Sequence, residues 1–255
     1  MCTQRTETLF KLLKLGLSGI KITRNATGAA HVEGIGSPEY PGPVGQTDTN
    51  FGLAIVRWGA RALLSLGEEF PSTLGKDPAV AHYREILGQM VPFSHDSTGF
   101  MLDPTHRFLL PHRHWSHIIM IYDLELAEGR FNHSAGADNS LLTTSLDHWS
   151  GLTCNDTRTC PNSCRGFSRG ATAVMSALMN RPEAARGNLT QLLDQVIAPN
   201  GMYGEGVTTN AYGSERYQLS PCPESAYIGS AALHEQLLHS DVAPAADGKR
   251  SVLRP

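Results

Sequence analysis

Residues 51–66, FGLAIVRWGARALLSL, place apolar side chains three and four positions apart along the chain. This spacing is typical of a helix with one apolar face. The same spacing recurs in six further blocks, residues 9–20, 80–91, 115–126, 171–179, 189–197 and 227–238. Strand-like alternation is nearly absent, so the sequence predicts an all-α fold.

Glycine and proline interrupt these blocks at residues 34–45, 71–78, 99–111 and 199–223. Each interval is too short to be a domain, and residues in long loops commonly carry the chemistry of a protein. We therefore expect one helical domain over residues 1–240 with functional loops. The polar, Ala- and Pro-rich residues 241–255 are expected to form a flexible tail.

The composition excludes several classes of protein. The chain has 255 residues, of which 40% are hydrophobic and 18% charged, and its net charge is −3. This is the composition of a globular domain. The apolar stretch at residues 9–22 is interrupted by lysines, so no membrane span is expected. There is no basic run either, so nucleic acid is not an expected partner.

Two features bear on the cellular compartment. Four N-glycosylation acceptor motifs begin at Asn25, Asn132, Asn155 and Asn188. Cys154, Cys160 and Cys164 lie in a polar segment, where a disulfide is favoured over free thiols and over zinc. With Cys2 and Cys222 there are five cysteines, and their pairing stays open. A secretory or extracellular protein is expected, although the first residues carry no signal peptide.

The first candidate catalytic group is Glu39. It lies between Pro38 and Pro41, which stiffen the backbone and favour an extended loop. Such a glutamate could be a positioned acid whose pKa is raised by burial, although a solvated loop residue would look the same. Shortly after it, Thr47 or Asp48 is expected to cap the helix that begins near residue 47.

A dense polar cluster, HRHWSH, follows Pro111 at residues 112–117 and is expected to open a helix. Zinc is disfavoured because no carboxylate lies within the cluster and the histidine spacing does not fit a helical metal site. Arginine and histidine can donate to sugar hydroxyls, and tryptophan offers an apolar face to a pyranose ring. A helix start whose histidines satisfy backbone carbonyls is the alternative.

Glu224 is a second candidate carboxylate. It follows Pro223 and precedes a helix expected to start near Ala226. Glycoside hydrolysis requires two carboxylates, one to protonate the leaving oxygen and one to activate water or to attack. Glu39 and Glu224 form such a candidate pair.

In their order along the chain, these motifs resemble glycoside hydrolase family 95, the inverting α-L-fucosidases. SPEY at residues 37–40 is similar to that family's Ser-Pro-Glu-Asn element, which carries the general acid, and TDT at residues 47–49 resembles its Thr-Met-Asp helix start. HRHWSH resembles its His-Arg-His-x-Ser-His element at the fucose subsite. GFS at residues 166–168 resembles its Gly-Trp-Ser helix, with Phe167 in place of tryptophan. Glu224 stands where the family has the aspartate that assists the attacking water.

The resemblance implies part of an (α/α)6 catalytic barrel. Such a toroid has twelve helices and the sequence shows about seven to nine, so the barrel is expected to be open, or completed by hairpins supplied elsewhere. The family's upstream Asn-x-Asn element has no counterpart before the first helical block.

The implied function is the hydrolysis, with inversion and without a cofactor, of terminal α-L-fucosyl or α-L-galactosyl residues of an oligosaccharide or polysaccharide. Glu39 would be the acid and Glu224 the base. The implied sugar-binding residues are Asp48, His112, Arg113, His114 and His117. An inactive carbohydrate-binding remnant and another toroid enzyme, such as a phosphorylase or lyase, stay open as alternatives.

Overall fold

The computed structural model describes residues 2–42, 44–124, 126–134, 136–155, 166–196, 204–209, 215–221 and 223–238. The chain divides into two compact units, and each is described by itself. The first contains Met1–Phe108 and Ser116–Arg130, and the second contains Leu109–Trp115 and Phe131–Pro255. In the part of the chain that is described, no helix combines the length and apolarity needed to cross a membrane.

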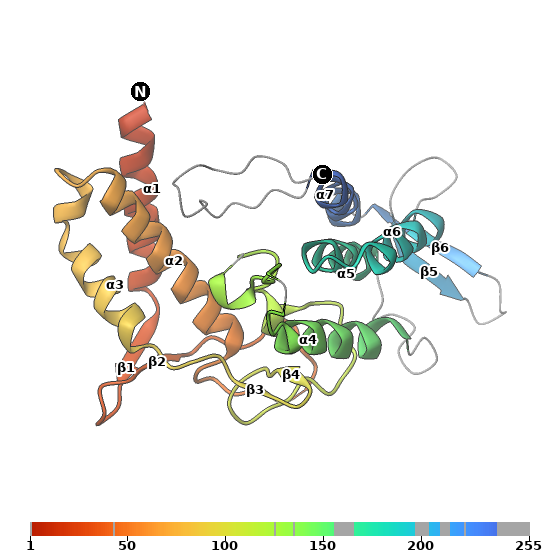
Figure 1. Ribbon diagram of the computed structural model, residues 1–255, viewed down its shortest axis with the longest axis horizontal. Helices are drawn as coiled ribbons and strands as arrows, with labels where there is room; N and C mark the ends of the chain where they lie inside the picture. Colours follow the sequence, from red (N-terminus) through yellow and green to blue (C-terminus); the bar gives the residue numbers. More distant parts are fainter. Residues whose placement is uncertain are drawn as a thin grey trace. The chain divides into compact units, whose positions relative to one another are not determined.

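The first unit is built around three α-helices. In Figure 1, α2 runs beside α1 and α3. Among the described residues of the unit there are also two short antiparallel hairpins and three single-turn 3-10 helices. The elements are α1 (Cys2–Ser18), β1 (Lys21–Arg24), β2 (Ala30–Glu33), α2 (Asn50–Glu69), η1 (Leu74–Lys76), α3 (Pro78–Gln89), β3 (His95–Asp96), β4 (Gly99–Phe100), η2 (Ser116–Ile118) and η3 (Ala127–Gly129).

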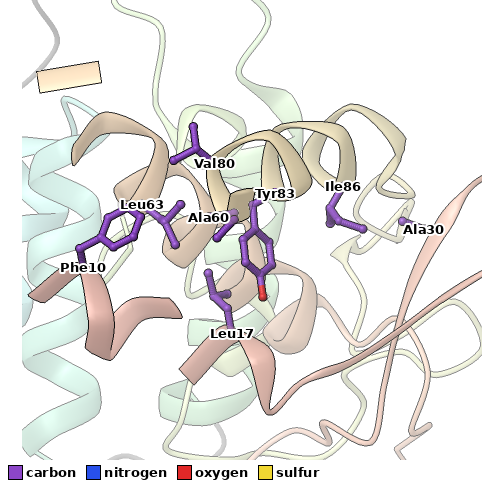
Figure 2. Close-up of a cluster of buried hydrophobic side chains, with 9 residues drawn as sticks. Phe10, Leu17, Ala30, Ala60, Leu63, Val80, Tyr83 and Ile86 are labelled. Atoms are coloured by element: carbon purple, nitrogen blue, oxygen red, sulfur yellow. The ribbon is translucent and has the colours of Figure 1, made fainter. Parts of the chain in front are cut away.

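The apolar core of this unit lies where the three helices meet (Figure 2). Phe10 of α1, Leu63 of α2 and Ile86 of α3 are each at most 3% exposed. Gly59 lets α1 and α2 approach closely, because a Cβ atom there would lie 3.0 Å from a methyl carbon of Leu17. The apolar spacing of the sequence therefore produces one contiguous core shared by α1, α2 and α3.

The second unit contains α4 (Ser140–Ser150), the π-helical turn η4 (Gly151–Asn155), α5 (Gly166–Leu178), α6 (Pro182–Val196), β5 (Gly204–Thr209), β6 (Glu215–Pro221) and α7 (Pro223–Leu238). Helix α5 packs against both α6 and α7. Gly170 makes the second contact possible, since a Cβ atom there would lie 2.2 Å from Ile228 of α7. Strands β5 and β6 form an antiparallel pair.

The expectation of a mostly helical chain is confirmed. Six of the seven predicted blocks fall in α1, α2, α3, α5, α6 and α7. Cys154 is disulfide-bonded, as the favoured alternative expected. Cys160, Cys164, Cys222 and residues 241–255 lie outside the described residues, as does the side chain of Cys2. The prediction of one domain over residues 1–240 stays a prediction.

The helix predicted at residues 115–126 is wrong. The segment forms the single 3-10 turn η2 and then a loop that Leu126 closes by donating its amide to the carbonyl of Met120, at 2.9 Å. Ile118, Met120, Ile121 and Leu126 are all buried. Ile118 and Met120 are both buried although they are only two positions apart, so the apolar residues do not mark one face of a helix.

Candidate functional site

Glu39 lies on a loop whose two ends are joined by backbone hydrogen bonds in the first unit. The amide of Gly34 donates to the carbonyl of Gln46 and that of Asp48 to the carbonyl of Val32, both at 2.7 Å. An isolated antiparallel bridge also pairs Glu33 with Thr47. Residues 34–46 are therefore a loop with closed ends, of the compact kind that often carries function.

Two residues beside Glu39 fix the loop to distant parts of the first unit. The hydroxyl of Ser37 contacts the hydroxyl of Ser116, which belongs to the HRHWSH cluster. The ring centroids of Tyr40 and Phe108 lie 5.2 Å apart. The structure thus brings the first candidate motif together with the end of the second one, although 79 positions separate the two serines.

Asp103 holds the end of the same loop. Its carboxylate is 1% exposed and accepts the amide of Gly45 at 2.6 Å, together with bonds from Thr105 and His106. Burial raises the pKa of Asp103, but these hydrogen bonds outweigh that effect and hold it below its usual value. Asp103 therefore stays ionised at neutral pH and keeps its hold on Gly45.

Glu39 itself has a left-handed backbone, with φ +53°. For a residue other than glycine this conformation is sterically costly and persists only where the surroundings impose it. The side chain is exposed. The expected burial of Glu39 against apolar neighbours is therefore wrong, because the prolines and anchors fix its backbone and leave its carboxylate at the surface.

The helix after the loop is capped differently from the prediction. Helix α2 begins at Asn50, and Thr49 is its N-cap, accepting the amide of Gly52 at 3.0 Å. The Thr49 hydroxyl also donates to the carbonyl of Ile35 at 2.5 Å. Thr47 and Asp48 were the expected caps, but Asp48 has φ +54° and its side chain is engaged elsewhere.

Substitution of Thr49 by alanine is expected to lower the free energy of unfolding by about 1–2 kcal/mol, because both the cap and the bond to Ile35 are lost. Thr49→Ser keeps the hydroxyl and should lose less than half as much. Urea denaturation of the two variants measures the difference. Equal losses would show that the methyl group of Thr49, rather than its hydroxyl, is what stabilises the helix start.

Asp48 is 5% exposed, and both of its oxygens bond within the protein. Oδ1 accepts the amide of Val32 at 2.9 Å, and Oδ2 lies 2.6 Å from Nδ1 of His31. The role of Asp48 in sugar binding stays a prediction. Sequence reasoning missed His31, whose only signal was an Ala-His-Val-Glu alternation typical of a strand.

His117 also belongs to the first unit. It is 1% exposed and stacks on Phe108, with ring centroids 4.3 Å apart and planes within 10°. Since Phe108 also contacts Tyr40, the two aromatic contacts connect His117 to the Glu39 loop.

The rest of the histidine cluster lies in the second unit, where its backbone is held by side chains from two helices and a turn. The carbonyl of His112 accepts from Trp149 of α4, at 3.1 Å, and from Thr153 of η4, at 3.0 Å. The carbonyl of Arg113 accepts from Ser168 of α5 at 3.1 Å. The predicted helix start is therefore wrong here, because side chains satisfy these carbonyls in place of helical amides.

Aromatic contacts fix the same segment. The ring centroid of Phe167 of α5 lies 4.3 Å from that of Trp115 and 5.7 Å from that of His114. His114 in turn meets His112 edge to face at 4.9 Å. His112 is buried, whereas Arg113 and His114 are partly exposed. The GFS motif thus supports the histidine cluster directly.

Glu224 lies in the first turn of α7, which begins at Pro223. The expectation of a loop carboxylate before a helix starting near Ala226 is wrong, because proline fits the first position of a helix. The Glu224 side chain is exposed. A carboxylate in this turn is favoured by the helix dipole.

The seven candidate residues are thus divided between the units. Glu39, Asp48 and His117 belong to the first, and His112, Arg113, His114 and Glu224 belong to the second. A separate cavity of about 530 Å³ in the first unit is lined by residues of α1, β1 and α3 and by Ile20, and none of the seven candidates lines it. Two basic side chains in its lining form ion pairs, Lys14 with Asp77 and Arg24 with Glu85.

Comparison with known proteins finds neither a protein-family model nor a curated protein that matches this sequence. The resemblance to family 95 therefore rests on the motifs and their order.

Proposed function

We propose that this chain is part of an inverting glycoside hydrolase of the α-L-fucosidase type. Its substrates would be oligosaccharides or polysaccharides that end in α-L-fucosyl or α-L-galactosyl residues. Its helices would form part of an (α/α)6 barrel, and no cofactor takes part in the reaction. The observation that carries the proposal is the construction of the Glu39 loop.

That loop combines three features. Its ends are joined through the backbone, its middle is anchored at Ser37 and Tyr40, and the anchored residue between them, Glu39, has a left-handed backbone. Strained backbone that is imposed by several contacts is concentrated at functional sites. A catalytic acid needs fixed placement and access to substrate. The backbone of Glu39 is fixed by these contacts, and its carboxylate is exposed.

In the proposed reaction, the Glu39 carboxyl donates its proton to the glycosidic oxygen as the bond from that oxygen to the anomeric carbon breaks. Glu224 takes a proton from water, which adds to the opposite face of the sugar and releases β-L-fucose. Arg113 and His114, whose segment is fixed by Ser168 and Phe167, donate to the sugar hydroxyls.

A proton NMR time course with 2′-fucosyllactose tests the proposal. We expect β-L-fucose to appear first, because direct attack by water inverts the anomeric centre, and α-L-fucose to grow in by mutarotation. Early α-L-fucose would contradict the inverting mechanism. Intact substrate throughout would contradict hydrolysis by this chain.

Carbohydrate binding without hydrolysis is the second candidate function, and the exposure of Glu39 favours it, since burial is the usual way to keep a carboxyl protonated near neutral pH. Saturation-transfer NMR with L-fucose separates the two. Binding of fucose by a chain that leaves 2′-fucosyllactose intact would support the second candidate and reject the first.

We also propose a secretory or extracellular location. The disulfide at Cys154 favours an oxidising compartment, and two acceptor asparagines, Asn25 and Asn132, are exposed. Expression in a secreting eukaryotic host, followed by deglycosylation and mass spectrometry, tests this. A secreted chain whose mass does not change on deglycosylation would count against it.

A further inference from the structure

We propose that His31 is a positioning residue, which acts through Asp48 to fix the base of the loop that carries Glu39. The proposal rests on the function proposed above insofar as Glu39 is the acid. His31 is the residue after Ala30 on β2 and precedes the loop, whereas Asp48 follows it. The pair therefore spans the two ends of residues 34–46.

The geometry defines how the two side chains interact. Oδ2 of Asp48 lies 2.6 Å from Nδ1 of His31, and Oδ1 accepts the amide of Val32 at 2.9 Å. A carboxylate can only accept, so Nδ1 carries the proton and donates it to Asp48. The side chain of Asp48 is 7% exposed and that of His31 25%, so the bond is largely sheltered from water.

The bond has a specific task at this position. Asp48 has a left-handed backbone, φ +54°, while its own amide bonds to Val32 at the loop base. Aspartate can adopt this conformation because its short side chain forms local hydrogen bonds, and here these bonds go to His31 and Val32. His31 and the amide of Val32 bond to the Asp48 side chain at the base of the loop. The hydroxyl of Thr49 donates to the carbonyl of Ile35, near the start of the same loop. Loss of the His31 donor should loosen the base and let Glu39 move.

Two amide substitutions separate the two nitrogens of His31. The amide nitrogen of asparagine can take the place of Nδ1, so His31→Asn keeps a donor for Asp48. The amide nitrogen of glutamine reaches the place of Nε2, so His31→Gln removes the donor at Nδ1. His95→Gln, at an exposed histidine on β3, is the matched control.

The first measurement is amide hydrogen exchange of residues 32–48, with α3 as the internal reference. We expect at least about tenfold faster exchange in His31→Gln and wild-type exchange in His31→Asn and His95→Gln. Exchange that is the same in His31→Asn and His31→Gln would overturn the proposal. Faster exchange in α3 as well would mean global destabilisation, and would also overturn it.

The second measurement is turnover of 2′-fucosyllactose. We expect His31→Gln to lower kcat by about tenfold to a hundredfold with KM within twofold, and His31→Asn to restore kcat, because a displaced acid impairs the chemical step more than binding. Restoration by His31→Gln instead would place Nε2 against the substrate and overturn the positioning role. If the wild-type chain hydrolyses nothing, the proposed function fails, and exchange alone decides the role of His31.

Discussion

Replacement of Glu39 by glutamine is expected to lower kcat on 2′-fucosyllactose by a factor of about 10²–10⁴, with little change in KM. Glutamine keeps the size of the side chain and cannot donate an acidic proton to the glycosidic oxygen. The sugar leaving group of this substrate departs poorly unless it is protonated, so loss of the proton donor should lower kcat by the whole of this factor.

The leaving group offers an internal test of this role. An aryl fucoside such as 2,4-dinitrophenyl α-L-fucoside releases a weakly basic phenolate, which needs no protonation. Glu39→Gln should therefore hydrolyse it at a rate within about tenfold of wild type. Equal losses on both substrates would show that Glu39 acts in some other way than as the acid.

Glu69→Gln is the matched control, because Glu69 is an exposed glutamate at the end of α2. It should leave both rates unchanged. Full activity of Glu39→Gln on 2′-fucosyllactose would remove Glu39 from the mechanism. Circular dichroism of the variant would check that the loop substitution leaves the helices intact.

The helices could be predicted because their apolar residues face one side. Leu53, Val56, Ala60 and Leu63 are all fully buried on α2, as their spacing requires. Helix α4 shows the limit of this reasoning, because Ser145 occupies one of its buried positions and weakens the apolar pattern of Leu142, Leu146 and Trp149. Ser145 can be buried there because its hydroxyl donates to the carbonyl of Leu141 in the same helix.

Hairpins were harder to predict from the sequence than helices. The turn between β1 and β2 depends on Asn25, whose side chain accepts the amides of Thr27 and Ala29, and on Gly28 with φ +86°. The two strands have only four residues each, so the alternation in Ala-His-Val-Glu is too short to distinguish a strand from the rest of the chain. Turn chemistry of this kind is local and leaves a weak trace in hydrophobic periodicity.

The candidate site could be predicted as motifs, but the contacts between them could not. Prolines beside Glu39 predicted a stiff loop, whereas the contact between Ser37 and Ser116 depends on how the first unit folds. His31 shows the same limit, since nothing in the sequence pairs it with Asp48, 17 positions away. Contacts over such distances follow from tertiary packing.

The second large effect is expected at Glu128, which joins two arginines of α2 to η3. Its carboxylate accepts Nη1 of Arg57 at 2.8 Å and both terminal nitrogens of Arg61 at 2.8 and 2.9 Å. The side chain of Arg57 is only 11% exposed, donates to the carbonyl of Val91 and lies 4.7 Å from the ring centre of Phe93. Glu128→Ala would leave a buried guanidinium without its counter-charge, so we expect a loss of about 3 kcal/mol in the free energy of unfolding.

The pH dependence of this loss has a definite sign. Burial raises the pKa of Glu128, but the hydrogen bonds and charges of Arg61 and Arg57 outweigh it and lower the pKa from 4.5 to about 2. A carboxyl whose pKa is lower in the folded state stabilises the fold above pH 4.5, and this contribution is lost as the pH falls toward 2. A lowering of this size corresponds to roughly 3 kcal/mol, and solvent screening at the part-exposed Arg61 reduces it to about 2.

Glu128→Gln should therefore be less stable than wild type at pH 7, with the difference shrinking between pH 4.5 and pH 2. Glu85→Gln is the control, because it removes an exposed ion pair to Arg24 in the same unit. It should change the free energy of unfolding by less than about 0.5 kcal/mol at pH 7 and at pH 2. Urea denaturation of the three proteins across this range measures both effects. A gap between wild type and Glu128→Gln that stays constant down to pH 2 would mean that Glu128 stabilises the fold through its shape and hydrogen bonds, and that its charge contributes nothing.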